Sequence, residues 1–274
     1  MVEKYMLINS NRAIQTDKKI DCDVADSKFV NQLFVRLIAK KRRFTNVNFK
    51  YAIFDNCYLR DCVFDSCNFT GVRFSGTNMQ GSSFSGCIFD YCTFDKTTID
   101  NDVLDSNCPS FENLKLKFAR TLRINYQQLG DAKSANKAMS VELQACEIHL
   151  HKASFSNDVY YRTKYRGWDR AKHVIEWLDF KLLDFIWGNG ESAWKLLRAV
   201  LLVFIVMTYI DISAWKDPSI PPNYADSFWK TPQIFLGVIS PDNYPKSYLT
   251  FIAFIRLVAM GFFMSIIIKR FNRR

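Results

Sequence analysis

Large apolar residues recur at every fifth position from Phe44 to Leu104, and this pattern holds its frame over thirteen pentads. Over most of the run, the position two residues before each pentad centre carries a small or compact side chain. A period of five matches neither the 3.6 residues of a helical turn nor the two-residue alternation of a strand. A chain that turns a corner every five residues closes a square coil every four pentads, so the pattern predicts a solenoid with both positions pointing inward. The centres are Phe44, Phe49, Phe54, Leu59, Phe64, Phe69, Phe74, Met79, Phe84, Phe89, Phe94, Ile99 and Leu104.

The pattern of Phe or Leu at the centre, with Ala, Cys or Ser two residues before it, resembles the pentapeptide-repeat family. The resemblance implies a right-handed four-sided β-helix over residues 44–108, a little more than three coils long. Small cysteines at the inward register are explained as core fillers, so we expect free thiols, no metal site and a reducing cytosol around the solenoid. These cysteines are Cys57, Cys62, Cys67, Cys87 and Cys92.

Residues 1–43 precede the repeat and lack the apolar stretch of a secretory signal. The sequence "SKFVNQLFVRLIAKKRRF" predicts an amphipathic helix that caps the first coil, because its apolar residues follow helical spacing. The basic cluster from Lys40 to Arg43 would either contact lipid headgroups or form a solvated helix end. The apolar positions are Val30, Leu33, Phe34, Leu37 and Ile38.

Residues 109–194 change to helical periodicity and are expected to form a cytoplasmic linker domain. Two helices joined by a turn at Gly130-Asp131 resemble a tetratricopeptide hairpin, with Leu114, Phe118, Leu122 and Tyr126 on one face of the first. The segment after them interleaves Trp and Tyr with Lys and Arg. This composition fits either nucleic-acid binding or a membrane interface, and the apolar segments that follow favour the interface.

Residues 195–274 contain two segments, about 195–212 and 248–268, that are apolar enough to cross a membrane. Basic residues flank both segments, whereas the loop between them has three Lys against four Asp. The positive-inside rule therefore predicts a multi-pass protein of the inner (plasma) membrane with both termini in the cytoplasm. The expected interface residues are Trp187, Trp194, Lys195, Arg198, Lys269 and Arg270.

A third apolar segment, about residues 226–240, is too short to span and is predicted to be re-entrant. Its helix would start either with Thr231 as N-cap and Pro232 as first residue, or from Asp226 with Pro232 as a kink. Span, re-entrant helix, Pro-rich turn and span together resemble the potassium-channel-like pore superfamily, and more closely bacterial proteins that join pentapeptide repeats to such a pore. The resemblance implies a homotetramer around an ion path.

The chain departs from that superfamily at the filter, where "LGVISPDNY" stands in place of a Gly-Tyr-Gly run. A ladder of backbone carbonyls is not expected there, so potassium selectivity is not carried over, and a ring of Ser240 or Asp242 is the predicted replacement. The candidate pore and filter residues are Gly237, Val238, Ile239, Ser240, Asp242, Ile252, Arg256, Met260, Phe263 and Ile267.

Arg256 lies in the middle of the second apolar segment, where a lone charge costs roughly 2.5–3.5 kcal/mol or more. The side chain would either line the pore, or brace it by pairing with Asp211 or Asp242 or by a hydrogen bond to the loop backbone. Gly261 is a candidate hinge, or a point of close helix packing.

The net charge of +10 over 274 residues favours an anionic partner or a membrane surface. It argues against the DNA-mimicking topoisomerase inhibitors among pentapeptide-repeat proteins, which need a long acidic rod. Phosphate-binding glycine loops, nucleophile elbows and His-Glu-x-x-His motifs are missing from the sequence, so we expect neither an enzyme nor a cofactor.

The sequence as a whole predicts a multidomain membrane protein: a tetrameric ion-channel-like assembly whose cytosolic repeat assembles subunits or senses a signal. The expected partners are other copies of the chain, the bilayer, permeating ions and an unidentified cytosolic trigger, without nucleic acid. The alternative is a membrane-disrupting effector or a membrane-anchored scaffold of a bacterial defence or stress system.

Overall fold

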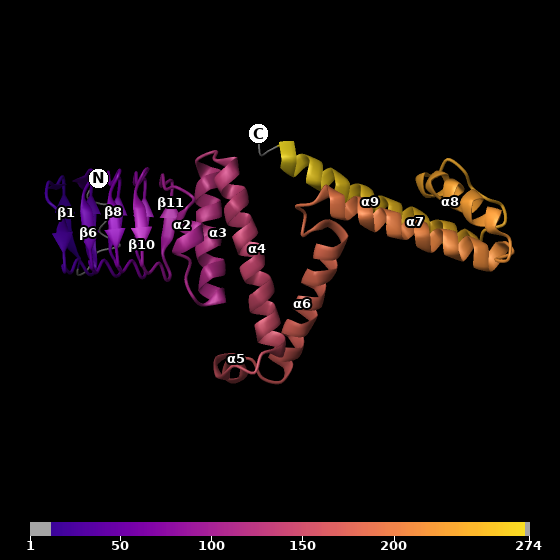
Figure 1. Cartoon of the computed structure of the whole chain (residues 1–274), viewed down its shortest axis with the longest axis horizontal. Helices are drawn as coiled ribbons and strands as arrows, with labels where there is room; N and C mark the ends of the chain where they lie inside the picture. The colour runs from indigo at the N-terminus through magenta and orange to yellow at the C-terminus, as the bar shows by residue number, and fades with distance from the viewer. Residues whose placement is uncertain (1–11, 272–274) are drawn as a thin grey trace. The chain divides into compact units, whose positions relative to one another are not determined.

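The computed structural model describes residues 12–271, with side chains up to Lys269, and divides into two compact units between Arg166 and Gly167 (Figure 1). This boundary falls inside the predicted linker domain of residues 109–194, because the first half of that segment packs on the solenoid and the second half packs on the first apolar helix.

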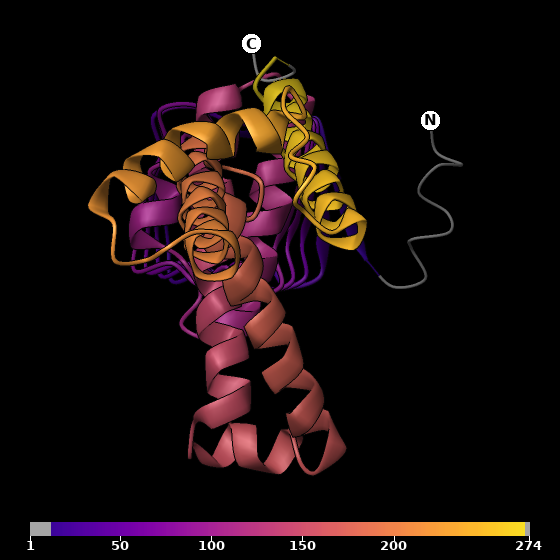
Figure 2. The ribbon, with the colours of Figure 1, turned by 90° about the vertical axis from the view of Figure 1, so that its right-hand side faces the viewer.

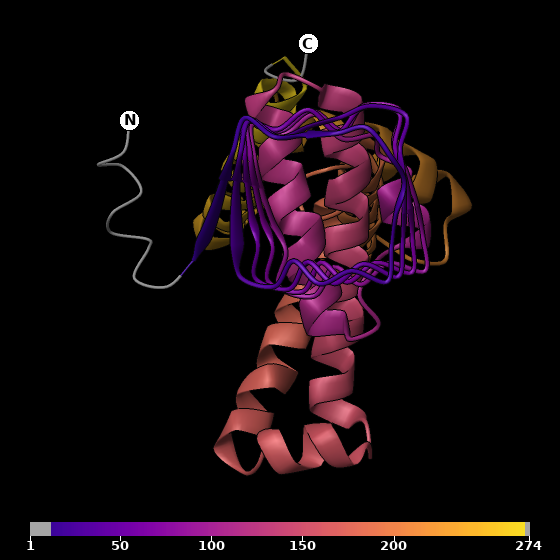
Figure 3. The same ribbon diagram turned by 90° about the vertical axis from the view of Figure 1, so that its left-hand side faces the viewer.

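The first unit begins with a four-sided solenoid of parallel strands, seen along its axis in Figure 3. One face is the five-stranded sheet β1-β4-β7-β9-β11, and the opposite face is β3-β6-β8-β10. Isolated bridges and the pair β2-β5 complete the other two faces. The strands are β1 (Ala13–Thr16), β2 (Lys19–Ile20), β3 (Val24–Ala25), β4 (Gln32–Val35), β5 (Ile38–Ala39), β6 (Arg43–Thr45), β7 (Ile53–Asp55), β8 (Val63–Asp65), β9 (Arg73–Ser75), β10 (Ser83–Ser85) and β11 (Thr93–Asp95).

The interior of the solenoid consists of stacked pentad centres, as the period of five predicts. Phe64, for example, is 1% exposed and stacks between Phe44 and Phe84, with ring centroids 4.9 and 5.2 Å away. Three of the four ladders of inward pentad centres, one on each face, are mainly aromatic, and offset stacking at these distances is favourable beyond the area that it buries. The fourth ladder contains Ala39, Leu59, Met79 and Ile99, all buried.

The small inward residues bind the backbone of the preceding coil. The thiols of Cys57 and Cys67 donate to the carbonyls of Phe34 and Phe44 at 3.4 and 3.3 Å, and the hydroxyl of Ser82 donates to that of Leu59 at 2.6 Å. Burial raises the pKa of the Cys57 thiol to about 12, so this thiol stays protonated and unreactive. All eight cysteines are free thiols.

The predicted capping helix at Val30–Ile38 is wrong, because this segment forms β4 and β5 and the solenoid extends back to Ala13. Two irregularities hide the repeat there. At Leu37 and Ala39 the large and small inward residues are exchanged, although both are buried. In addition, Ile20 pairs with Ala39 nineteen residues on, whereas Val24 pairs with Phe44 twenty residues on, so the first coil is one residue short.

The last coil ends in helix α2 (Val103–Ser106), which contains Leu104, the thirteenth pentad centre, and is covered by α3 (Glu112–Gln128). Side chains of α3 replace the next coil as hydrogen-bond partners. The Asn125 amide accepts from the Thr97 N–H and donates to the Thr97 carbonyl, both at 2.7 Å. Thr121 accepts from the N–H of Phe94 at 3.1 Å. An open sheet edge is thereby closed at this end.

Helix α3 forms the expected hairpin with α4 (Ala132–Phe155), and α5 (Val159–Lys164) follows. The predicted apolar face of α3 is buried against the solenoid and α4. Glu142 of α4 is only 8% exposed and accepts hydrogen bonds from Arg120 and Arg123 of α3, both at 2.7 Å. These charge-assisted bonds fix the register of the hairpin.

We expect Glu142→Ala to lower the free energy of unfolding of the first unit by about 1–3 kcal/mol, since it removes two charge-assisted bonds at a buried carboxylate. Lys117→Ala, at an exposed position of α3, is the control and should change stability by less than about 0.5 kcal/mol. Denaturant unfolding followed by circular dichroism measures both, and equal effects would contradict this role of Glu142.

The second unit consists of α6 (Trp168–Trp187), α7 (Ala193–Trp215), α8 (Pro221–Leu236) and α9 (Lys246–Phe271). Helix α9 runs alongside α7, and α8 lies beside one end of this pair (Figures 1 and 2). By length and composition, α7 and α9 are each able to cross a membrane. Both are longer than the predicted segments 195–212 and 248–268, because the residues that flank each segment continue the helix.

Candidate functional site

Most of the predicted interface residues lie at the junction between α6 and α7. Gly188, Asn189 and Gly190 adopt positive φ angles, and the turn that they form returns the chain onto α6. Lys195 then pairs with Asp184 at 2.7 Å.

The remaining predicted interface residues at this junction have different environments. Arg198 donates to the Phe185 carbonyl at 2.7 Å, Trp187 stacks on Phe262 of α9 at 4.3 Å, and Trp194 is 81% exposed. Lys269 lies 3.6 Å from Glu191, whereas the side chain of Arg270 lies outside the described residues.

The opposite ends of α7 and α9 are joined by a second cluster, which the sequence analysis did not identify. Asp211, 7% exposed, accepts a hydrogen bond from the hydroxyl of Tyr244 and lies 3.5 Å from Lys216. Lys216 also binds Asp226 of α8 at 2.9 Å, and Trp215 stacks on Tyr244 at 4.4 Å. The cluster therefore connects α7, α8 and the segment before α9.

The charges of this cluster stabilise one another. Burial lowers the pKa of Lys216, but its bonds to Asp226 and Asp211 outweigh burial and leave the pKa above its ordinary value. Burial, followed by the adjacent Asp211 carboxylate, raises the pKa of the Tyr244 hydroxyl, which therefore remains a donor at neutral pH. The signal in the sequence was a polar pair, Thr208 and Asp211, one turn apart in an otherwise apolar helix.

Helix α8 begins ten residues before Thr231, with Pro221 as an early residue and Pro232 inside the helix. Thr231 is therefore not the N-cap. Pro232 lies within the helix, as in the second of the two predicted arrangements, but the helix starts five residues before the predicted Asp226. The hydroxyl of Thr231 donates to the Ser227 carbonyl at 2.9 Å and contacts the hydroxyl of Thr208 in α7 at 3.1 Å. These polar contacts attach α8 to α7.

Gly237 ends α8 in the left-handed conformation, with φ of 80°. A Cβ atom at this position would collide with Nη1 of Arg256. The same nitrogen lies 3.5 Å from the Phe235 carbonyl, a long hydrogen bond to one of the last carbonyls of the helix. The guanidinium thus contacts the negative end of the α8 dipole.

The predicted pairing of Arg256 with Asp211 or Asp242 is not found among the described residues. The Asp211 carboxylate, near the end of α7, accepts a hydrogen bond from Tyr244 and pairs with Lys216. Asp242 is exposed. Arg256 instead contacts the Phe235 carbonyl. This contact agrees with the predicted alternative in which Arg256 forms a hydrogen bond to the backbone between the two spans.

The candidate pore residues of α9 share one face of the helix, and this predicted stripe does not have a uniform environment. Its members are Ile252, Arg256, Met260, Phe263 and Ile267. Ile252 is 4% exposed and packs with Met207 and Phe235, whereas Met260 is 63% exposed and Phe263 is also exposed. Helical rotation explains the difference: the packed face contains Ile252, Ile255, Ala259, Phe262 and Ile266, so Ile252 lies at its border with the predicted stripe. Ile267 is partly buried.

The segment from Gly237 to Asp242 is exposed apart from the half-buried Pro241, with Val238 at 76%. Gly261 lies inside continuous α9, and a Cβ there would meet no described atom within 4 Å. Close packing within this chain therefore does not explain Gly261. Among the residues that the structure describes, no group of three His, Cys, Asp or Glu side chains is placed to hold a metal ion.

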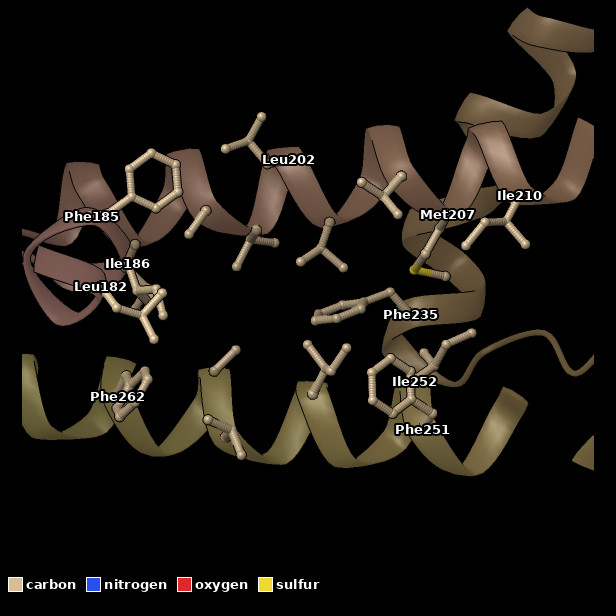
Figure 4. A pocket seen from close by; sticks show the side chains of 18 of the residues that line it. Leu182, Phe185, Ile186, Leu202, Met207, Ile210, Phe235, Phe251, Ile252 and Phe262 are labelled. Atoms are coloured by element: carbon tan, nitrogen blue, oxygen red, sulfur yellow. The ribbon is translucent and has the colours of Figure 1, made fainter. Parts of the chain in front are cut away.

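An apolar groove of about 400 Å³ separates α7 from α9 (Figure 4). The Phe235 side chain of α8 projects into it between the two helices, and Phe262 and Leu182 line the end near α6. Its lining is apolar apart from the hydroxyl of Tyr248, and it includes the thioether of Met207. The two long helices thus touch directly over only part of their length.

The comparisons with known proteins concern the solenoid. Residues 43–81 match a family model described as pentapeptide repeats (8 copies), and residues 64–104 match one described as pentapeptide repeats (9 copies). No curated protein matches the chain.

Similar solved structures include two trypsin-treated forms of QnrB1, described as a plasmid-mediated fluoroquinolone resistance protein. They are 16% and 18% identical, with TM-scores of 0.24 and 0.17 over 31% and 33% of this chain. The matched region spans 56% and 62% of the QnrB1 chains. The two family matches, together with the stacked parallel coils, show that the N-terminal part of the present chain is a pentapeptide-repeat β-solenoid domain, followed by a helical region with two long apolar helices.

Proposed function

We propose that the chain is a subunit of a tetrameric, ion-channel-like protein of the inner membrane, with α7 and α9 as spans and the solenoid in the cytosol. The observation that carries the proposal is the spacing of the two polar and aromatic clusters. Trp194 and Trp215 mark the ends of α7 and are about 32 Å apart at 1.5 Å per residue. This length matches a hydrocarbon core of about 30 Å, with aromatic residues at both interfaces.

The exposure of the two helices supports lipid or neighbouring subunits around them. Only 28% of the apolar stretch of α7 and 11% of that of α9 is buried inside the chain. A hydrophobic helix pair in a soluble core would be mostly buried, and an apolar surface of this extent is costly in water. Membrane insertion removes that cost.

The contact between α8 and Arg256 supports the re-entrant assignment. Arg256 lies ten residues into α9, or about 15 Å from its start, which is half the depth of a bilayer core. If α9 spans, the C-terminal end of α8 therefore reaches the midplane, and irregular backbone at that depth needs protein or water around it. At the axis of an assembly, water or neighbouring subunits would surround the segment from Gly237 to Asp242.

Geometry supports an oligomer, since two spans are too few to enclose a path for ions, and the resemblance to the pore superfamily supports four subunits. The outward apolar side chains of α9, such as Phe254, Leu257 and Met260, are available for neighbouring subunits or lipid. The cytosolic solenoid would assemble subunits or receive the gating signal.

The alternative function is a membrane-disrupting or membrane-anchored effector. It is favoured by one observation, the absence of a Gly-Tyr-Gly run from the segment after Leu236. The mass of the protein in detergent and single-channel recording in planar bilayers distinguish the two. We expect a tetramer with discrete conductance steps; a monomer, or graded leakage without unitary currents, would favour the alternative.

We also expect a cysteine introduced at Ser219, in a background without native thiols, to react with an impermeant reagent added outside the cell. Positions 10 and 272, which lie outside the described residues, should react only from the cytoplasm. The reason is the basic excess that flanks both spans. Labelling of either terminus from outside would reverse the proposed topology.

A further inference from the structure

Arg42 occupies a position that small side chains fill over most of the solenoid. It lies two residues before the centre Phe44, and the equivalent residue one coil later is Cys62, which is completely buried. The Nε atom of Arg42 is shielded from solvent and has no hydrogen-bond partner. A donor of a charged group without a hydrogen-bond partner costs free energy, so the unpaired Nε atom calls for a structural or functional explanation.

A pocket of about 330 Å³ adjoins this arginine. It is lined by Ile20 and Asp21 of the first coil, and by Lys40, Lys41 and Arg42 of the second. This is the corner where the first coil is one residue short: three residues separate Ile20 from Val24, whereas four separate their partners Ala39 and Phe44. The missing residue leaves space between the coils.

The pocket has a strong positive charge. Four cationic side chains line it, with Lys19 added to the three basic residues of the second coil, against one carboxylate. That carboxylate, Asp21, is already paired with Lys19 at 2.9 Å. The Arg42 guanidinium and the ammonium groups of Lys40 and Lys41 are therefore the donors available to an anion. Phosphate oxygens can accept hydrogen bonds both from the planar guanidinium of Arg and from the ammonium groups of Lys.

We propose that this corner of the solenoid is a binding site for a phosphate-bearing ligand, in which Arg42 is the central contact. The ligand is either a soluble phosphorylated molecule or the headgroup of an anionic lipid, and both present the same oxygens. The site is independent of the proposed ion conduction. It gives the solenoid a chemical input in addition to its structural role.

Calorimetric titration of inorganic pyrophosphate into the full chain, held in nanodiscs of phosphatidylcholine, tests the proposal. We expect saturable binding that weakens at least tenfold in Arg42→Ser, which installs a residue type that the repeat accepts at this register. Arg73→Ser is the matched control, because it removes an exposed basic residue of β9 that does not line the pocket. Lys41→Gln, at an exposed position, is a second variant that leaves the core unchanged and should weaken binding several-fold.

The proposal is overturned if the wild-type chain shows no saturable binding, or if Arg73→Ser loses as much affinity as Arg42→Ser and Lys41→Gln. Nanodiscs that contain phosphatidylglycerol separate the two sources of the phosphate. Loss of pyrophosphate binding there supports a lipid headgroup as occupant, whereas unchanged binding supports a soluble ligand.

Discussion

Phe64→Ala is expected to lower the free energy of unfolding of the solenoid by about 3–5 kcal/mol. The Phe64 ring is 1% exposed and is the middle ring of the ladder Phe44-Phe64-Phe84, so its removal leaves a cavity bounded by two aromatic rings. Rigid neighbours on both sides limit collapse into that cavity, because each is held in a hydrogen-bonded coil. Thermal and denaturant unfolding followed by circular dichroism measure the loss.

The neighbouring Asp65→Ala is the control for this experiment. Asp65 lies on the same strand but points outward, where it accepts one hydrogen bond from Ser66 at 3.0 Å. Its replacement should cost less than about 1 kcal/mol. Similar losses for Phe64→Ala and Asp65→Ala would show that the inward and outward positions of the coil have been assigned incorrectly.

Arg256→Gln is expected to abolish or strongly reduce tetramer formation, and to leave the reversal potential of any remaining channels unchanged. The guanidinium contacts the Phe235 carbonyl near the end of α8 and fits against Gly237, so its loss releases the segment proposed to reach the midplane. Gly237→Ala should have the same effect, because its Cβ would displace the guanidinium and strain a residue with φ of 80°. Mass measurement in detergent and recordings under asymmetric salt measure the two quantities.

Lys246→Gln, which removes a positive charge at the exposed first residue of α9, is the control and should preserve assembly. A tetramer of normal mass whose reversal potential shifts toward cations in Arg256→Gln would contradict the brace. That result would instead assign Arg256 to the lining of the pore, with four positive charges removed per assembly.

The regular part of the solenoid was predictable from sequence because each coil solves the same packing problem with the same residue types. Its first coils were not, since a helix and a defective repeat give the same spacing of apolar residues around Leu33 and Leu37. The exchange of sizes at Leu37 and Ala39 and the missing residue before Val24 become visible only when the coils are aligned in space.

The helices of the second unit were predictable in existence and order, but the polar contacts between them were not. The charge balance of the loop and the lengths of the apolar segments can each be read from one stretch of sequence. The contact between Asp211 and Tyr244 joins residues 33 positions apart, so no single stretch of sequence predicts it. The cost of an Arg in apolar surroundings predicted that Arg256 has a partner, with the loop backbone as one alternative. The particular carbonyl, that of Phe235, depends on how α8 packs against α9, and residue types do not reveal this packing.

The amide of Asn125 and the hydroxyl of Thr121 bond to the backbone of the last coil and do not depend on how many coils precede it. A gene that gains or loses sixty nucleotides in frame within the repeat therefore changes the rod by one coil, about 4.8 Å, and keeps the same terminal lid. Length can drift in such steps during evolution without new chemistry at the junction with the hairpin. The solenoid can therefore act as a spacer whose length changes only by whole coils.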